Sequence, residues 1–322
     1  MPPRSRQLPP TAILLVTGLI SIAAVVAFMT VGARGNWSFV LPFRGTKLIG
    51  MVLVAFAIAV STVLFQTITN NRILTPSIMG FDALYVLIQT CFVFFLGAQQ
   101  VSTLDPRLLF VAEVGLMVLF SCLLYRWLFS GAVRSLHLLL LVGIIFGVLF
   151  RSFSGFLQRI IDPNEFIVLQ DRLFASFNTI DTGLLGVSLL AVLLAALAGL
   201  RVFHTFDVLA LGRETAIDLG VDHKRITTII LILVAVLVSV STALVGPVTF
   251  FGLLVANLAY QLMPTARHSV VLPMAALLAV ISLVGGQLIL ERLFAFDTAL
   301  GIVIDFAGGV FFILFLMRRA AR

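Results

Sequence analysis

The most constraining feature of this sequence is a series of long, uninterrupted apolar runs. An α-helix needs about 20 apolar residues to cross the hydrocarbon core of a bilayer. We expect spans near residues 12–32, 47–69, 77–98, 108–129, 136–161, 182–203, 225–245, 250–263, 269–291 and 299–317. The eighth run, with about 14 residues, is the shortest and barely reaches across. The pattern predicts an all-α polytopic membrane protein with about ten transmembrane helices, in which residues 1–322 form a single transmembrane domain.

The composition agrees with this assignment. Hydrophobic residues make up 61% of the 322 residues and charged residues only 11%, against about 25% charged in soluble domains. The total of about 196 hydrophobic residues is enough for at most about ten spans. This excludes a soluble enzyme, a secreted disulfide scaffold and a disordered chain. The continuous runs also exclude a porin-type barrel, whose strands alternate apolar and polar residues.

The basic residues indicate how the chain crosses the membrane. A net charge of +7 is compatible with nucleic-acid binding, but in a polytopic chain lysine and arginine mainly mark the cytoplasmic loops. With the N-terminus in the cytoplasm, ten spans place twelve basic residues inside and six outside. We therefore expect a multi-pass membrane protein with both termini cytoplasmic and no nucleic-acid partner.

Two connecting segments are longer than the others. Residues 162–181, outside, are partly apolar and are expected to form a short interfacial helix. Residues 204–224, inside, are the most polar stretch and carry apolar residues at helical spacing. We expect two short amphipathic helices there, one capped by Asp207, with Gly212 and Gly220 ending the pair.

No catalytic motif is present in the sequence. It lacks the G-x-x-x-x-G-K-[ST] phosphate loop and the zinc and serine-hydrolase signatures. Cys91 and Cys122 lie inside apolar runs without metal or disulfide spacing and are interpreted as buried small hydrophobes. Enzymatic chemistry within this chain is therefore not expected, and neither is a metal site.

Three acidic residues, Asp82, Glu113 and Asp305, fall inside apolar runs, where ionisable groups are costly. One interpretation is a proton relay, which makes the chain an ion-coupled secondary transporter. The other is that these acids form buried hydrogen bonds or salt bridges between packed helices. The sequence leaves both open.

Small residues and helix breakers have two interpretations as well. Gly143 and Gly147 form a G-x-x-x-G pair, followed in the same run by Ser154 and Gly155. These residues either permit close helix packing or line a passage for a large substrate. Gly246-Pro247 follows the seventh run and Pro273 lies inside the ninth. Interrupted backbone is tolerated in lipid only beside protein or a cavity, which fits either a transporter or a channel.

Five segments together resemble one family of membrane proteins. They are RGTK (44–47), FQTITNNRILTPSIMGFDALY (65–85), LGRETAIDLGV (211–221), GPVTFFGLLV (246–255) and LGIVIDFAGGVFFILFLMRR (300–319). In this order and spacing they are similar to the FecCD family, the permease subunits of ABC importers for iron–siderophores, haem and cobalamin. The form of the second segment is most similar to permeases for catecholate-type siderophores such as petrobactin and anguibactin.

The resemblance implies a type II ABC importer permease fold and a set of partners. It implies two ATPase subunits that bind ATP and magnesium, so that this chain carries no cofactor of its own. It also implies a second permease subunit, with a heterodimer favoured over a homodimer, and a periplasmic or lipoprotein binding protein. The implied substrate is a ferric siderophore.

The resemblance also assigns roles to residues. The ATPase-coupling helices are expected at about 206–222, with the coupling residues Gly212, Arg213, Glu214, Thr215, Ala216, Leu219, Gly220 and Val221. Arg213 stands where the family usually has an acid. The basic residues Arg44, Lys47 and Arg292 match the positions that dock the binding protein, with Lys47 in place of an arginine. Ala256-Asn257 replaces a common Pro-His pair, so this span is expected to bend less.

Overall fold

The computed structural model describes residues 9–32, 35, 37–130, 136–178, 180–293 and 300–320, and this part of the chain is helical without strands. The helices that match the ten apolar runs are α1 (Pro10–Thr30), α2 (Trp37–Thr69), α3 (Phe81–Leu96), α5 (Pro106–Ser130), α6 (Leu136–Gln158), α8 (Thr182–Arg201), α11 (His223–Val245), α12 (Phe251–Leu262), α13 (His268–Leu293) and α14 (Leu300–Ala320). Each predicted run therefore forms a helix, which confirms the all-α membrane fold.

Seven of these helices are long and apolar enough to cross a membrane within the described residues. The shorter apolar helices are α3, α12 and, in α14, the stretch Leu300–Leu314. α2 begins at Trp37, ten residues before the expected start of the second span, so Arg44 and Lys47 lie within a helix rather than in a loop. α13 continues through Pro273, which lies inside the helix, although a proline there cannot donate the usual backbone hydrogen bond.

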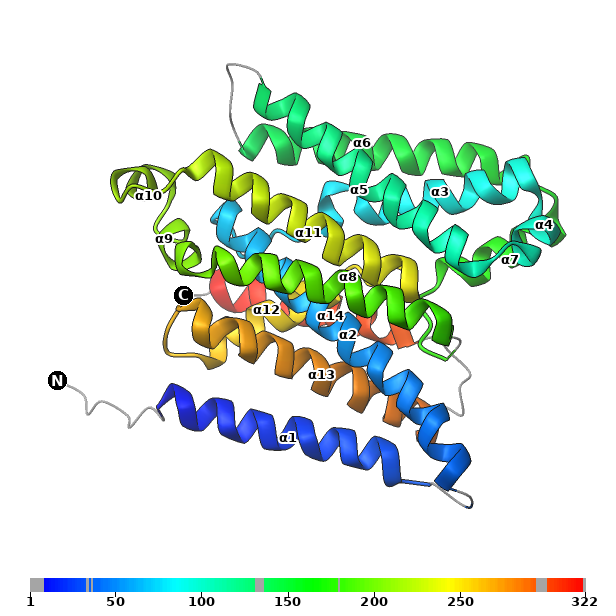
Figure 1. Ribbon diagram of the computed structural model, residues 1–322, viewed down its shortest axis with the longest axis horizontal. Coiled ribbons are helices and arrows are strands. Elements are labelled where there is room, and N and C mark those ends of the chain that lie inside the picture. The colour runs from blue at the N-terminus through cyan, green and yellow to red at the C-terminus, as the bar shows by residue number, and fades with distance from the viewer. Residues whose placement is uncertain are drawn as a thin grey trace.

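Two central helices organise the bundle. α2 and α11 are the most buried candidate spans, with 67% and 72% of their apolar windows buried, against 17% for α1. α2 packs against α11 and α13, and α11 also packs against α5 and α8. Figure 1 shows α1 along one side of the bundle next to α13, and α5 and α6 along the opposite side. The apolar surfaces of these outer helices remain exposed, as expected of surfaces that face lipid or another membrane subunit.

Short helices occupy the two ends of the bundle. The polar loop forms η2 (Phe203–Thr205), α9 (Phe206–Leu209) and α10 (Arg213–Asp218). At the opposite end lie α4 (Ala98–Thr103) and α7 (Pro163–Leu173), the latter being the helix expected in the outer loop. We call these ends the α10 end and the α4 end (Figure 1). A further short helix, η1 (Pro76–Met79), precedes α3.

The capping residues of the polar loop differ in part from expectation. Gly220 follows α10 with φ of +82° and donates its N–H to the Ile217 carbonyl, so it terminates this helix as predicted. Gly212, with φ of +99°, donates its N–H to the Leu209 carbonyl at 3.0 Å and so closes the turn after α9, and it also directly precedes α10. Asp207 does not cap α9; its carboxylate accepts a hydrogen bond from the backbone N–H of His268, the first residue of α13. This tertiary contact cannot be inferred from local sequence.

Candidate functional site

The segment Gly246–Phe250, which joins α11 to α12, interrupts the regular helices. α12 has 12 residues, so it is about 18 Å long, well short of the hydrocarbon thickness of about 30 Å. With its last residues at the α10 end of the bundle, its first residues and the preceding segment lie at membrane depth. Irregular backbone at that depth needs partners within the protein.

Two of the three intramembrane acids supply these partners. Asp82, at the start of α3, accepts a hydrogen bond of 2.8 Å from the Thr249 hydroxyl. Asp305, on α14, accepts one of 3.0 Å from the backbone N–H of Phe250, at the positive end of the α12 dipole. The two carboxylates therefore hold the interrupted segment from two helices, which favours the structural interpretation of both.

Glycines allow the chain to approach this segment closely. Gly246 has φ of +94°, and a Cβ there would lie 2.9 Å from Cα of Ala175. The N–H of Ser176 donates to the Val245 carbonyl at 2.8 Å. The non-helical segment that follows α7 therefore crosses directly over the end of α11. Pro247 then prevents α11 from continuing.

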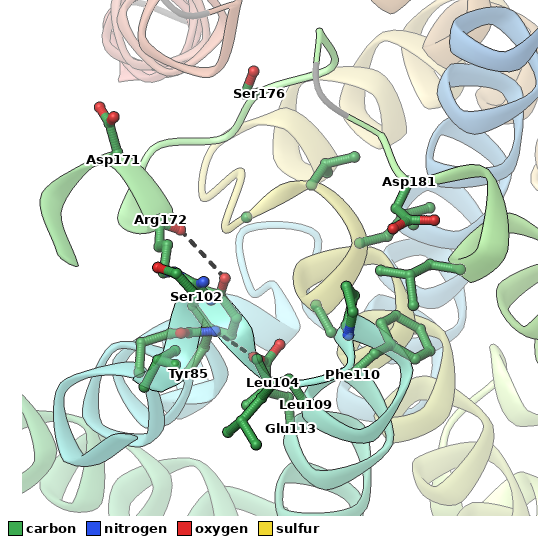
Figure 2. A pocket seen from close by; sticks show the side chains of 18 of the residues that line it. Tyr85, Ser102, Leu104, Leu109, Phe110, Glu113, Asp171, Arg172, Ser176 and Asp181 are labelled. Carbon is green, nitrogen blue, oxygen red and sulfur yellow. Dashed lines mark hydrogen bonds between the residues drawn. The ribbon is translucent and has the colours of Figure 1, made fainter. Parts of the chain in front are cut away.

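The third acid, Glu113, has separate surroundings. It accepts a 2.7 Å hydrogen bond from Nε2 of Gln89 and lines a cavity of about 430 Å³ near the α4 end. Figure 2 shows this cavity, with Tyr85 donating to the carbonyl of Arg172 at 3.3 Å. Among the described residues, no hydrogen bond joins Glu113 to Asp82 or Asp305, so Glu113 is separate from the pair of acids at the interrupted segment.

The small residues of α6 serve mainly to pack helices. Gly143 and Gly147 lie against Met79 and Gly80, and a Cβ on Gly80 would come within 2.9 Å of Cα of Gly147. The buried Ser154 hydroxyl donates to the Phe150 carbonyl of its own helix at 2.7 Å. By contrast, a Cβ at Gly155 would meet no atom within 4 Å. That these four residues of α6 line a passage for substrate stays a prediction.

The three basic residues predicted for docking lie together at the α4 end, but they differ in accessibility. Arg44 donates to the carbonyls of Phe28, at 2.7 Å, and Val31, at 3.0 Å. The exposed Arg292 also donates to the Val31 carbonyl. Both arginines thereby close the end of α1.

Lys47 is only 6% exposed. Its Nζ lies 3.8 Å from Oε1 of Glu291 and donates to Oδ1 of Asn178 at 3.2 Å. A lysine held in this way joins α2 to α13 and offers little surface to a partner. The docking prediction therefore depends on Arg44 and Arg292.

At the α10 end, the predicted coupling residues form a projecting surface. Ala216 is fully buried, whereas Arg213, Glu214, Thr215 and Gly220 are exposed. Three large apolar side chains in this loop are also exposed: Leu211 by 60%, Ile217 by 51% and Leu219 by 60%. Exposed apolar side chains of this kind are typical of sites that contact another protein or the membrane. Ile217 was not among the predicted coupling residues.

Beside this surface is a polar cavity of about 540 Å³ between the ends of α2, α12 and α13. Asn257 and Gln66 both donate to the Arg72 carbonyl, at 3.1 and 2.8 Å. The Arg72 guanidinium lies over the ring of Tyr260, 4.3 Å from its centroid. Asn257, which departs from the family's usual residue, thus fastens the turn after α2.

Asp207 links this region to the bundle. Partial burial acts to raise its pKa, but hydrogen bonds from the backbone N–H and ring of His268 outweigh burial and hold the pKa below its usual value. The carboxylate is therefore ionised at neutral pH. The His268 partner of Asp207 cannot be predicted from local sequence, because the two residues are far apart in the chain.

The apolar helices, the interrupted segment at membrane depth and the exposed surface at one end define a polytopic membrane transport protein. The chain belongs to the FecCD transport family, whose model matches residues 10–318. It is 50% identical to the petrobactin import system permease protein YclO of Bacillus subtilis, over 88% of this chain and 90% of that protein. It is 36% identical to the petrobactin import system permease protein FatC of Bacillus anthracis, over 96% and 88% of the two chains.

Solved structures show the same fold. A metal-chelate type ABC transporter in an inward-facing conformation superposes with a TM-score of 0.83 at 22% identity, covering 96% of this chain and 99% of that one. PsaBC from Streptococcus pneumoniae superposes with a TM-score of 0.60 at 15% identity, covering 91% and 94%. The resemblance found from the motifs is therefore confirmed, and the ion-coupled secondary transporter is not supported.

Proposed function

We propose that this chain is the permease subunit of a bacterial ABC importer that takes up iron as a ferric siderophore, and that its substrate is ferric petrobactin. The observation that carries this proposal is the 50% identity to YclO, a petrobactin import permease, over 88% of the chain. The second petrobactin permease, FatC, at 36% identity, supports the same substrate class.

The energy source in this proposal is a pair of separate ATPase subunits, which bind ATP and magnesium. Two observations support it: the sequence has no phosphate loop, and α10 presents exposed Ile217 and Leu219. The coupling surface consists of Gly212 to Ala216 with Leu219 to Val221. This assignment places the α10 end in the cytoplasm with both termini of the chain, in the plasma membrane, and agrees with the bias of basic residues.

The remaining proposed partners are a second permease and a binding protein. We favour a heterodimer of two different permeases, with a homodimer as the alternative. The binding protein, periplasmic or a lipoprotein, docks at the α4 end through acidic residues that pair with Arg44 and Arg292. This docking is supported by Arg44, which is partly exposed, and Arg292, which is exposed.

Uptake of radiolabelled iron tests the function. A strain that lacks this permease should lose uptake of ferric petrobactin and regain it when the gene is restored. Ferric enterobactin, ferric hydroxamates and ferric citrate serve as competing substrates. Uptake should stop when the ATPase is deleted; uptake that persists without the ATPase but collapses with a protonophore would overturn the proposal.

A further inference from the structure

A chain of short hydrogen bonds connects the α10 end to the interior of the bundle. Oδ1 of Asp207, on α9, lies 2.6 Å from Nδ1 of His268. Nε2 of the same ring lies 2.7 Å from Oγ1 of Thr67, on α2. The three residues come from three separate elements, and His268 is only 2% exposed. These hydrogen bonds therefore tie α9, α13 and α2 together; His268 and Thr67 are buried, whereas the Asp207 side chain is 49% exposed.

Every polar atom of the His268 side chain has a partner in this arrangement. A carboxylate only accepts hydrogen bonds, so Nδ1 carries the proton that it donates to Asp207. Asp207 accepts a second bond, of 2.8 Å, from the backbone N–H of His268. It thereby also caps the start of α13 with a negative charge. Satisfied polar groups in a buried site hold one geometry, because every alternative leaves a group unpaired.

Aromatic packing reinforces the same connection. The rings of Phe206 and His268 meet edge to face, with centroids 5.7 Å apart, and Phe203 packs against Phe206 at 5.6 Å. Phe206 is 2% exposed. The loop that carries α9 and α10 is therefore seated on the end of α13 by both a ring and a carboxylate.

The two helices reached by this chain are joined again at their far ends. α2 carries Lys47 twenty residues before Thr67, which is about 30 Å along a helix and matches the hydrocarbon thickness. There Lys47 pairs with Glu291 of α13, and Gln287 Nε2 bridges Glu291 and Asn178 at 3.1 and 2.8 Å. α2 and α13 thus form a pair cross-linked by polar contacts at both ends.

We propose that Asp207, His268 and Thr67 are positioning residues that transmit movement of the α9–α10 loop to the α2–α13 pair, and through it to the α4 end. The inference rests on the proposed function, in which an ATPase docks on this loop. Without the hydrogen bonds that join Asp207, His268 and Thr67, the ATPase still binds and hydrolyses ATP, but its movement does not reach the helices at the α4 end.

The test uses the whole complex of permeases and ATPase in proteoliposomes with its binding protein and ferric petrobactin. Thr67→Val removes the hydroxyl that meets the ring, and His268→Gln and Asp207→Asn change the other two members. We expect Thr67→Val to lower uptake about fivefold, the effect of one lost hydrogen bond, and His268→Gln about tenfold or more. ATP hydrolysis without the binding protein should stay within about twofold of wild type, whereas its stimulation by the loaded binding protein should fall with uptake.

Matched variants separate positioning from general damage. Thr67→Ser keeps the hydroxyl and should restore uptake. Thr17→Val removes a buried hydroxyl that, within the described part of the chain, bonds only the Ile13 carbonyl of its own helix. His204→Gln changes an exposed histidine next to the loop. Both variants should behave as wild type.

The outcomes are distinguishable. Thr67→Val and His268→Gln complexes with wild-type uptake and wild-type stimulation would overturn the inference alone. If the Thr67→Val permease no longer assembles with the ATPase, the hydrogen bonds of Asp207, His268 and Thr67 serve folding only. That result would also overturn the inference. A wild-type complex without ATP-driven uptake would overturn the proposed function, and the inference with it.

Discussion

At the scale of single residues, the intramembrane carboxylates act as hydrogen-bond acceptors for backbone and hydroxyl groups. Asp82 and Asp305 hold Thr249 and Phe250 of the interrupted segment, and Glu113 accepts from Gln89. An acceptor does not need to titrate to do this. Replacement by an amide, which also accepts, therefore differs in its consequences from replacement by an apolar side chain.

Asp305→Asn should keep siderophore uptake within about twofold of wild type, because the amide oxygen still accepts from the Phe250 N–H. Asp305→Leu leaves that N–H without its partner and should destabilise the protein by about 1 kcal/mol. Thermal unfolding in detergent and iron uptake measure the two effects. Abolished uptake in a stable Asp305→Asn protein would contradict the structural role and point to proton transfer.

At the scale of elements, two kinds of helix contact matter: close packing between helices and exposed apolar surface on short helices. Gly80 meets Gly147 backbone to backbone, so η1 and α3 press against α6. α10 instead buries only Ala216 and leaves its other side chains exposed, where the proposed ATPase can reach them. We expect the first contact to affect stability and the second to affect assembly.

Gly80→Ala should destabilise the permease by about 1–3 kcal/mol, because its φ of +90° disfavours a side chain. The added Cβ would also lie 2.9 Å from Cα of Gly147, where no flexible atom can move aside. Gly115→Ala, in α5, meets no atom within 4 Å and is the matched control. Equal melting temperatures for the two variants would show that this packing is not tight.

Ile217→Glu combined with Leu219→Glu should reduce co-purification of the ATPase about tenfold or more, since exposed apolar side chains at an interface centre contribute most of the binding energy. The fold should be unaffected, because both side chains are at least half exposed. Gln99→Glu with Gln100→Glu places two charges on exposed positions of α4 and is the control. Normal ATPase recovery with the α10 variant would exclude this surface as the docking site.

At the scale of the whole molecule, two polar ends flank an apolar bundle. The α10 end carries the projecting loop and the α4 end carries Arg44 and Arg292. The central helices α2 and α11 run between them and are the most buried of the spans. Movement at the α10 end can therefore be transmitted to the α4 end through these two packed helices.

Arg44→Glu with Arg292→Glu should lower uptake at least about tenfold while protein levels stay normal, because like charges repel the acidic face of the binding protein. Both arginines also hold the end of α1, so Arg44→Gln with Arg292→Gln, which keeps donors without charge, is the necessary control. The charge-reversed pair should be clearly weaker than the neutral pair and should recover with a binding protein of opposite charge. Wild-type uptake in the charge-reversed protein would exclude docking at these residues.

The sequence by itself determined the ten apolar helices, the interruption at Gly246-Pro247 and the presence of a polar loop with short helices. These follow from hydropathy and backbone chemistry that are local in the chain. Five motifs in order also identified the family, which the comparison over residues 10–318 confirms.

Only the tertiary structure decided which polar residues meet. Lys47 is expected from sequence to face a partner, yet it is buried against Glu291. Asp207 is expected to cap its own helix, yet it binds His268, 61 residues away. In a membrane interior, each polar group must find a partner wherever the packed helices bring one. Such pairs depend on packing across the bundle, and no local pattern in the chain records them.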